Sequence, residues 1–409
     1  MHTFKQHIIE AKNTKNLHLS HIEDLVLDGG VEGTRAAINA LRALRDMLAG
    51  TSSGSHSVTV KWDGAPAVFA GTDPTDGEFF VAKKGIFNKN PKVYKSHNDI
   101  DNDTSGDLSD KLKIAYTELK KIGIKGVIQG DIMFTKPDLK AETIDSEKYI
   151  TFHPNTIVYA IPKEQASDVL NAKIGVVWHT SYTGDSFENM TASFGVNISS
   201  LKKVKSVWSK SADLPDLTSV ATLTKKDTAT VTQFLSNAGT IFRKISSSIL
   251  KEVSDNKEIN MAINTFNNTK VREAEKIINS DLHVRELMAW IQKRYQKDID
   301  KLKSVKGKEK KTKQLEDVMK FFSSSNKKGL TLMFDLQNEL VAAKEMLIAQ
   351  LSQIQNTKTF VKTSKGFKVT GAEGFVAIDN LTGGAVKLVD RMEFSTNNFS
   401  ANIIKGWQK

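Results

Sequence analysis

A lysine, an acid and a glycine follow the short β-branched run 58–60 in the order Lys61-Trp62-Asp63-Gly64. Burial of a lysine at the end of a strand disfavours its ammonium form, which frees the nitrogen lone pair for attack on an electrophile. Gly64 allows the backbone to turn close to a bound ligand. The spacing therefore predicts a nucleophilic lysine, and the alternative interpretation is a strand end followed by an ordinary turn.

Three later segments place a charged residue on or beside an apolar run that is typical of a strand. They are Asp131 (after Gly130) within 127–134, Glu373 just before 374–378, and Lys387 within 385–389. Taken singly, each charge fits a solvated strand end or an exposed strand face. Their common order along the chain, after Lys61, is what indicates a shared site.

In this order the segments resemble the covalent nucleotidyltransferases, the superfamily of ATP-dependent polynucleotide ligases and mRNA capping enzymes. The likeness is closest to phage-type RNA and DNA ligases, and it covers about residues 55–180 and 360–395. The matching segments are Lys61 to Gly64 for motif I, Gly130-Asp131 for motif III, Glu373-Gly374-Phe375-Val376 for motif IV and Lys387 for motif V. Lys84-Gly85 also resembles a basic residue–glycine step that follows motif I in many ligases.

The resemblance implies ATP and Mg²⁺ as cofactors and roles for the matching residues. Attack of a lysine on the α-phosphate requires a nucleophile, a divalent metal and a second cation that neutralises the phosphate oxygens. Lys61 would be the nucleophile and Lys387 the α-phosphate clamp, and Asp131 and Glu373 would contact the ribose or hold Mg²⁺ through water. The implied nucleotide-binding set is Lys61, Asp63, Gly64, Lys84, Asp131, Glu373 and Lys387.

The chain also departs from the motifs of this superfamily. Pro66 stands where many of these enzymes have an arginine, the motif III acid is the shorter Asp131, and Val389 occupies the position of a second motif V lysine. Lys84 and Arg391 are candidates to supply the missing charge. Candidates for stacking on the base are the aromatic residues Phe134, Trp178 and Phe375.

The function expected from the resemblance is that of an ATP-dependent polynucleotide ligase, which forms a lysyl-AMP intermediate and seals 5′-phosphate and 3′-hydroxyl ends of RNA or DNA. Two alternatives stay open. One is a capping-type guanylyltransferase, and the other is a catalytically inactive nucleic-acid-binding phage protein with the same fold.

Composition limits the class of protein. The chain has 409 residues, 39% of them hydrophobic and 26% charged, as in globular proteins, and it contains no run long enough for a membrane span. No secretory leader is evident, so we expect a cytoplasmic location, which is the host cytoplasm if a phage encodes the chain. The absence of cysteine excludes disulfides and thiolate metal sites, and the net charge of +11 favours a nucleic-acid partner.

The pattern of turns and apolar residues predicts an α+β fold with a mostly antiparallel core, which the resemblance implies is a nucleotidyltransferase core. We expect an N-terminal helical segment at 1–50, the core at 51–184 and 358–409, and a long helical insertion at 185–357. Within these parts, 29–33 and 98–110 are predicted as loops, the former because no strand precedes its glycines.

A lysine run in the insertion is the candidate nucleic-acid contact. It consists of Lys301, Lys303, Lys306, Lys308, Lys310, Lys311 and Lys313, with Glu309 as its only acid. These lysines could bind phosphates, and a solvated helical hairpin is an equally good interpretation.

Overall fold

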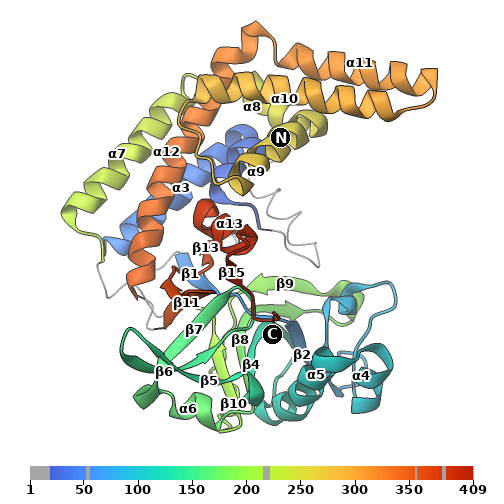
Figure 1. Cartoon of the computed structure of the whole chain (residues 1–409), viewed down its shortest axis with the longest axis vertical. Coiled ribbons are helices and arrows are strands. Elements are labelled where there is room, and N and C mark those ends of the chain that lie inside the picture. Colours follow the sequence, from blue (N-terminus) through green and yellow to red (C-terminus); the bar gives the residue numbers. More distant parts are fainter. Residues whose placement is uncertain (1–18, 52–55, 215–221, 355–356, 380–383, 409) are drawn as a thin grey trace.

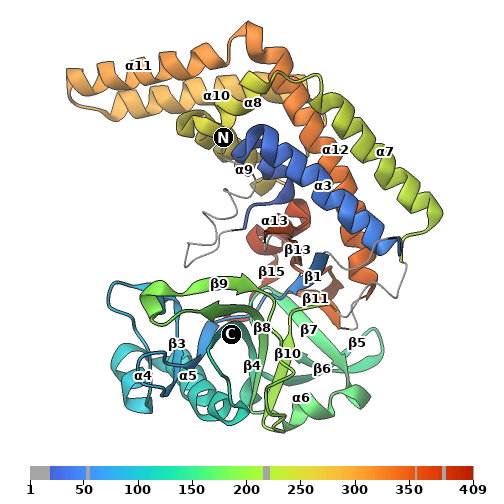
Figure 2. The same ribbon diagram turned by 180° about the vertical axis from the view of Figure 1, so that it is seen from behind.

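The computed structural model describes residues 19–51, 56–214, 222–354, 357–379 and 384–408. It has a helical lobe and a lobe of packed β-sheets, joined at a small sheet between them (Figure 1, Figure 2). The predicted mixed α+β class is confirmed, and most strand pairs are antiparallel. Residues 1–18 of the predicted N-terminal helical segment and 52–55 of the following linker lie outside the described residues.

Three sheets organise the strands. The junction sheet has the order β1 (His56–Lys61), β13 (Gly374–Asp379), β14 (Ala385–Leu388). The central sheet runs β10 (Val207–Ser211), β8 (Ile174–Thr183), β4 (Val127–Thr135), β2 (Ala67–Thr72), β3 (Phe79–Ala82), with β9 (Thr191–Phe194) paired to β8. The outer sheet runs β12 (Gly366–Val369), β11 (Lys358–Thr363), β7 (Ile157–Pro162), β6 (Glu147–Phe152), β5 (Lys140–Ile144), with β15 (Ile403–Ile404) paired to β11.

The central and outer sheets pack face to face. Their shared core includes Phe134 and Trp208 from the central sheet and Phe152 and Tyr159 from the outer sheet. The opposite face of the central sheet is covered by α5 (Gly106–Leu119), whose Leu112, Ala115 and Leu119 are fully buried against it. Both faces of the central sheet are therefore shielded from water, which explains why its strands are continuous apolar runs.

The remaining short helices of the β lobe lie on its loops. They are η2 (Lys84–Phe87), α4 (His97–Asp103), η3 (Lys120–Ile122), η4 (Lys136–Asp138), η5 (Lys163–Gln165), α6 (Ser167–Asn171) and η6 (Phe187–Asn189). The last helix of the chain, α13 (Arg391–Phe399), follows the junction sheet and lies between the lobes (Figure 1).

The helical lobe is built from two parts of the chain that are far apart in the sequence and share one hydrophobic core. Its elements are η1 (Ile22–Asp24), α2 (Leu25–Asp28), α3 (Gly30–Leu48), α7 (Lys225–Phe242), α8 (Ser247–Asp255), α9 (Lys257–Arg272), α10 (Ser280–Lys301), α11 (Val305–Phe321) and α12 (Ser324–Ile354). Residues of α3, α7 and α12 share the largest hydrophobic core, which also includes Val58, Phe375 and Leu388 of the junction sheet. The amphipathic patterns predicted helices at α7 and α12, and both are confirmed.

Three local expectations are wrong. Residues 185–211, predicted as helical insertion, contribute β9 and β10 to the central sheet, so the long helices begin only with α7. β10 pairs with β8 in parallel, so its short apolar run is hydrogen-bonded to a neighbouring strand and does not form a helix. Residues 29–33 form the start of α3 instead of a loop, because Gly33 packs directly against the backbone of Leu25. Residues 98–110, predicted as a loop, are mostly helical, because α4 ends at Asp103 and α5 begins at Gly106, and the first turn of α4 is capped by the Ser96 side chain.

Candidate functional site

The junction sheet brings Lys61, Glu373 and Lys387 together. Lys61, the last residue of β1, pairs with Gly374 of β13, and Lys387 of β14 pairs with Val376 on the other side of β13. The Lys61 ammonium contacts the Glu373 carboxylate as an ion pair. Antiparallel pairing thus places three of the predicted site residues, from two distant parts of the sequence, side by side.

Asp131 lies near this group because the segment after β1 runs alongside β4, the strand of the central sheet that carries Asp131. The Ala65 N–H donates to the Ile132 carbonyl and the Ile132 N–H donates to the Pro66 carbonyl, each over 3.0 Å. A Cβ atom at Gly64 would lie 2.4 Å from the Cβ of Asp131. Only glycine therefore allows this close approach of the Lys61 segment to the Asp131 strand.

Burial raises the pKa of the two site acids, Asp131 and Glu373. Desolvation raises the pKa of Asp131 to about 7 although the Lys61 ammonium opposes the shift. Desolvation likewise raises the pKa of Glu373 to about 7, against the Coulomb attraction and hydrogen bond of Lys61. Asp63 adds repulsion to both carboxylates. At neutral pH each acid is close to its midpoint, so an added cation would shift both to their ionised forms.

Two further lysine side chains, Lys387 and Lys84, lie near the two acids. Burial lowers the pKa of Lys387, and the neighbouring Lys61 charge acts in the same direction, while Glu373 and Asp24 oppose the shift. Lys84 is exposed at the start of η2 and is close enough to Asp131 to favour ionisation of its carboxyl. Repulsion between like charges makes this a site where an anion, such as a phosphate, would be stabilised.

His179 is a site residue that the sequence reasoning missed. Its Nε2 lies 3.7 Å from Asp131 Oδ2, and burial lowers the pKa of the imidazole to about 4, with Lys61 adding to the shift. The register of β4 and β8 jumps from Gln129–Thr180 to Gly130–Trp178, which leaves His179 as the extra residue of a β-bulge. Bulges re-aim side chains, and no sequence signal shows one before the partner strand is known.

Asp63 is tied to the outer sheet. One carboxylate oxygen accepts from the Thr156 and Ile157 N–H groups over 2.7 and 2.9 Å, and the other accepts from the Asn155 amide. The Asp63 N–H donates to the Tyr159 hydroxyl over 2.6 Å. With both oxygens engaged, Asp63 fixes the path of the segment that carries Lys61 and Gly64, and its contact with a nucleotide stays a prediction.

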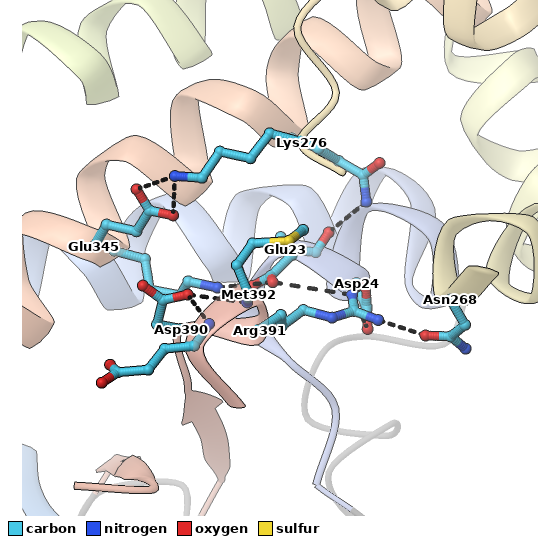
Figure 3. Close-up of polar contacts among 11 residues, drawn as sticks. Glu23, Asp24, Asn268, Lys276, Glu345, Asp390, Arg391 and Met392 are labelled. Carbon is cyan, nitrogen blue, oxygen red and sulfur yellow. Dashed lines mark hydrogen bonds and ion pairs between the residues drawn. The ribbon is translucent and has the colours of Figure 1, made fainter. Parts of the chain in front are cut away.

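Several expectations about the surroundings change. The Lys61 side chain is 33% exposed, so its environment is less enclosed than the strand end suggested. Phe134, Trp178 and Phe375 are each at most 1% exposed within hydrophobic cores and have no face open to a base. Arg391 does not join the site, because its guanidinium binds the Asp24 carboxylate and the Asn268 amide (Figure 3).

The lysine run lies on a projecting hairpin, away from Lys61. Lys301 ends α10, Lys303 lies in the connection, and the other five lysines lie on the first turns of α11, at the tip of the arm seen in Figure 1. All are exposed except Lys311, whose ammonium lies 4.5 Å from the centre of the Tyr295 ring. The arm is thus a basic surface with an aromatic component.

The donor set near Lys61 fits a hard cation. Among the described residues no group of three or more His, Asp or Glu side chains could enclose a metal ion. Asp131 and Glu373 are two carboxylates beside the Lys61 ammonium, and carboxylate oxygens are ligands that Mg²⁺ prefers. Glu373 and Asp131 are therefore the residues that could hold Mg²⁺.

Comparison with known proteins places the chain in a family. None of the helices in the described part of the chain combines the length and apolar character that crossing a bilayer requires. No curated protein and no solved structure matches the sequence. One family profile, described as "Family of unknown function (DUF6267)", matches residues 16–403. The chain therefore belongs to the DUF6267 family.

Proposed function

We propose that this chain is an ATP-dependent polynucleotide ligase that works through a lysyl-AMP intermediate. The observation that carries the proposal is the clustering of Lys61, Asp131, Glu373 and Lys387 from three separate segments of the chain. Lys61 lies between two acids of raised pKa and next to a second lysine. Such a cluster of buried charges destabilises the fold, and clusters of this kind are typical of functional sites. The resemblance of the same residues to nucleotidyltransferase motifs supports the specific reaction.

In the first step the Lys61 amine attacks the α-phosphorus of ATP. A P–N bond forms while the bond from the α-phosphorus to the bridging oxygen breaks, and pyrophosphate leaves with that electron pair. Before the attack, the Lys61 ammonium passes one proton to the Glu373 carboxylate, which contacts Nζ, and the nitrogen releases a second proton to solvent as the P–N bond forms. Lys387 stabilises the negative charge that develops on the α-phosphate oxygens.

In the second step a 5′-phosphate oxygen of the polynucleotide attacks the phosphorus of the lysyl-AMP. The P–N bond breaks, Lys61 recovers its electron pair and a proton, and AMP is now joined to the 5′ end. In the third step a 3′-hydroxyl attacks that 5′-phosphorus and a phosphodiester bond forms. The anhydride bond to AMP breaks, AMP leaves with that electron pair, and the hydroxyl proton is released to solvent. Positioning and charge stabilisation by the protein account for most of the catalysis in such transfers.

Asp131 and Glu373 are the residues that would hold Mg²⁺. When bound, the ion supplies charge neutralisation on the phosphate oxygens. The two acids must be ionised to bind it, and their pKa values of about 7 make that binding dependent on pH near neutrality.

The arm formed by α10 and α11 is the proposed polynucleotide contact. The seven lysines of the 301–313 run neutralise phosphates without reading bases, which suits an enzyme that joins ends of different sequence. Exposed lysines on a projecting hairpin can reach a strand whose end lies at Lys61, and the net charge of +11 favours the encounter.

The test is intact-mass spectrometry after incubation with ATP and Mg²⁺. Wild type should gain the mass of one AMP, and Lys61→Arg should not, because arginine keeps the charge beside Glu373 but is no nucleophile. Lys358→Arg is the matched control, since Lys358 is also a strand lysine paired with a glutamate, Glu147, over 2.8 Å. An adduct that persists in Lys61→Arg contradicts the assignment, and labelling by GTP in place of ATP would indicate the guanylyltransferase alternative.

A specific observation keeps the non-catalytic alternative as a second candidate. Val389, at the position of the second motif V lysine, is 3% exposed and packs in the interior, so this position supplies no charge to a phosphate. A protein of that kind would bind nucleic acid in a salt-dependent way and form no adduct with either nucleotide. The mass experiment, combined with a binding titration, separates the two candidates.

A further inference from the structure

A groove of about 580 Å³ runs over the outer sheet of the β lobe. It is lined by residues of β5, β6, β7, β11 and β12, by residues of α5 and η4, and by the C-terminal segment 404–408. No described residue of the Lys61 site or of the arm contributes to its wall. Its volume lies in the usual range of ligand sites, so it is large enough for a nucleotide unit.

Two lysines in the wall have no acidic partner. The ammonium groups of Lys140 on β5 and Lys362 on β11 make no ion pair or hydrogen bond with the part of the chain that the structure describes. Both lie near His153, because burial lowers the pKa of its imidazole to about 4 and the Lys362 and Lys140 charges add to this shift. Two like charges beside one imidazole, without a counter-ion, form a place where a bound anion would be stabilised.

Acidic side chains also line the groove, namely Asp107, Asp110, Asp138 and Glu142. The Lys111 ammonium neutralises Asp107 and Asp138, whose carboxylates lie 3.1 and 3.7 Å from it. Asp110 is exposed on α5, and Glu142 is partly exposed on β5. A ligand that fits this wall therefore carries hydrogen-bond donors for the acids as well as negative charge for the lysines.

Trp407 is an exposed aromatic residue of the C-terminal segment. It is 63% exposed, and its neighbours Gly406 and Gln408 both line the groove. The Gly406 N–H donates to the Asn155 carbonyl over 2.6 Å, and a Cβ atom at this glycine would collide with the His153 carbonyl. The backbone beside Trp407 is therefore fixed against the loop between β6 and β7. An exposed aromatic ring next to unpaired lysines is the combination with which proteins bind single-stranded nucleic acid.

We propose that this groove binds a single-stranded end of a polynucleotide, with phosphates at Lys140 and Lys362 and a base stacked on Trp407. A nucleic-acid strand brings negative charge, N–H donors on its bases and flat aromatic faces in one ligand. Inorganic phosphate and acidic peptides supply the charge but offer no ring to the indole.

One loop links the groove to the segment that carries Lys61. The Asn155 amide and the Thr156 N–H bind the Asp63 carboxylate, and the Asn155 carbonyl accepts from Gly406. In both views the outer sheet and α11 lie at opposite ends of the molecule, with β1 between them (Figure 1, Figure 2). A strand held by the arm and by the groove therefore passes the Lys61 segment. The inference rests on the proposed function only in taking a polynucleotide as the partner.

The test is fluorescence anisotropy at low salt with a 3′-labelled hexanucleotide that carries a 5′-phosphate, in RNA and DNA forms. The protein is the full chain with three arm lysines neutralised, namely Lys306→Gln, Lys308→Gln and Lys310→Gln. In this background the arm contributes little to affinity, so the binding that remains reports on the groove. Circular dichroism checks the fold of every variant.

In this background, Lys140→Gln with Lys362→Gln should weaken binding of the hexanucleotide about tenfold or more. The matched control is Lys148→Gln with Lys163→Gln, which removes the same charge from two exposed lysines of the β lobe outside the groove. The control should bind as the background does.

Trp407→Ala should also weaken binding about tenfold or more, because one stacked base is lost. Its control is Phe399→Ala, since Phe399 is 62% exposed but does not line the groove. The control should leave the affinity unchanged.

Three results would overturn the proposal: a hexanucleotide bound no better than a hexaglutamate peptide, equal weakening by both lysine pairs, or binding that survives Trp407→Ala. An AMP adduct on Lys61 without binding at the groove would reject this inference and keep the proposed function. Binding at the groove without an adduct would keep the inference and reject the ligase reaction.

Discussion

At the scale of single residues, the site is defined by two acids that burial keeps near their midpoint. Asp131 lies in the central sheet and Glu373 directly precedes β13 of the junction sheet; both are near the Lys61 ammonium and have pKa values of about 7. Their protonation therefore responds to small changes in the charge around them. This makes pH and substitution of the acids the most direct probes of the site.

We expect the rate of self-adenylation with ATP and Mg²⁺ to rise from about pH 6 to about pH 8, because both acids must be ionised to hold the ion. The pH profile of AMP incorporation, measured by mass spectrometry at saturating ATP, checks this. Circular dichroism over the same range serves as the control for folding. A rate that is constant through this range would contradict an essential role for the two carboxylates.

We expect Asp131→Asn to stabilise the fold at about pH 8 and to leave it nearly unchanged at about pH 4, where the unfolded state also holds most of this proton. The raised pKa means that the native state holds a proton which the unfolded state releases above about pH 4, so stability from this group falls as pH rises to 7. An asparagine avoids the buried charge, and the gain should be about 1–2 kcal/mol after allowance for partial exposure.

Calorimetric unfolding at the two pH values measures this effect, with the exposed Asp110→Asn as the control. The same Asp131→Asn variant should lose self-adenylation by about 10²-fold, the scale of losing one charge stabiliser. Destabilisation at pH 8 would mean that the Lys61 and His179 contacts outweigh the desolvation of Asp131.

At the scale of elements, strands position the chemistry and helices provide surface. β1, β13 and β14 hold Lys61, Glu373 and Lys387 at fixed register, and β4 supplies Asp131 at the crossing of the central sheet. The buried residues of the arm lie mostly near its base, with Ile299 buried close to the tip, and six of the seven lysines of the 301–313 run are exposed. Substitutions at the tip should leave the core site unaffected.

We expect Lys306→Gln, Lys308→Gln and Lys310→Gln together to weaken binding of single-stranded RNA or DNA and to reduce its salt dependence. Each lost phosphate contact should lower the slope of log affinity against log salt by roughly 0.7 for single strands. Fluorescence anisotropy across a salt series measures this. Self-adenylation should survive, since ATP reaches Lys61 without the arm.

The matched control neutralises three exposed lysines of the β lobe, Lys202, Lys203 and Lys205. It changes the net charge by the same amount but not the arm. Equal weakening in both triple variants would show that only overall charge matters, and an unchanged arm variant would return α10 and α11 to a solvated hairpin.

At the scale of the whole molecule, segments far apart in the sequence, such as η1 and α12, pack in one core. η1 contacts α12 through the Lys344–Glu23 pair, with side chains 1% and 5% exposed, and the Gln337 amide donates to the Glu23 carbonyl over 3.0 Å. The helical lobe thus encloses a buried ion pair next to the strands of the junction sheet. Loss of this ion pair should destabilise the whole helical lobe.

We expect Lys344→Met to lower the free energy of unfolding by about 3–5 kcal/mol, because it leaves the Glu23 carboxylate buried and unpaired. The double variant Glu23→Leu with Lys344→Met should recover most of this loss, since both charges are gone. Urea denaturation measures both.

Lys276→Met is the control, because the pair between Lys276, in the segment after α9, and Glu345 of α12 is more exposed and is expected to contribute less than about 1 kcal/mol. If the double variant were as unstable as the single one, the pair would have to act through packing and not through charge.

The sequence by itself determined the elements that carry the motifs. Alternating apolar runs predicted β1, β4, β13 and β14, and helical periodicity predicted α7 and α12, because both patterns depend on near neighbours in the chain. The motif order also grouped Lys61, Asp131, Glu373 and Lys387 before any geometry was known. That grouping came from resemblance, and the structure brings these residues together.

Tertiary structure alone decided what these residues experience. The raised pKa of Asp131, the re-aimed His179 in its bulge and the burial of Trp178 all depend on contacts with segments far away in the sequence. The same is true of β9 and β10, whose short runs become strands only because β8 offers an edge. Local pattern sets which element forms, whereas desolvation, partner strands and enclosed space arise only when distant segments pack together.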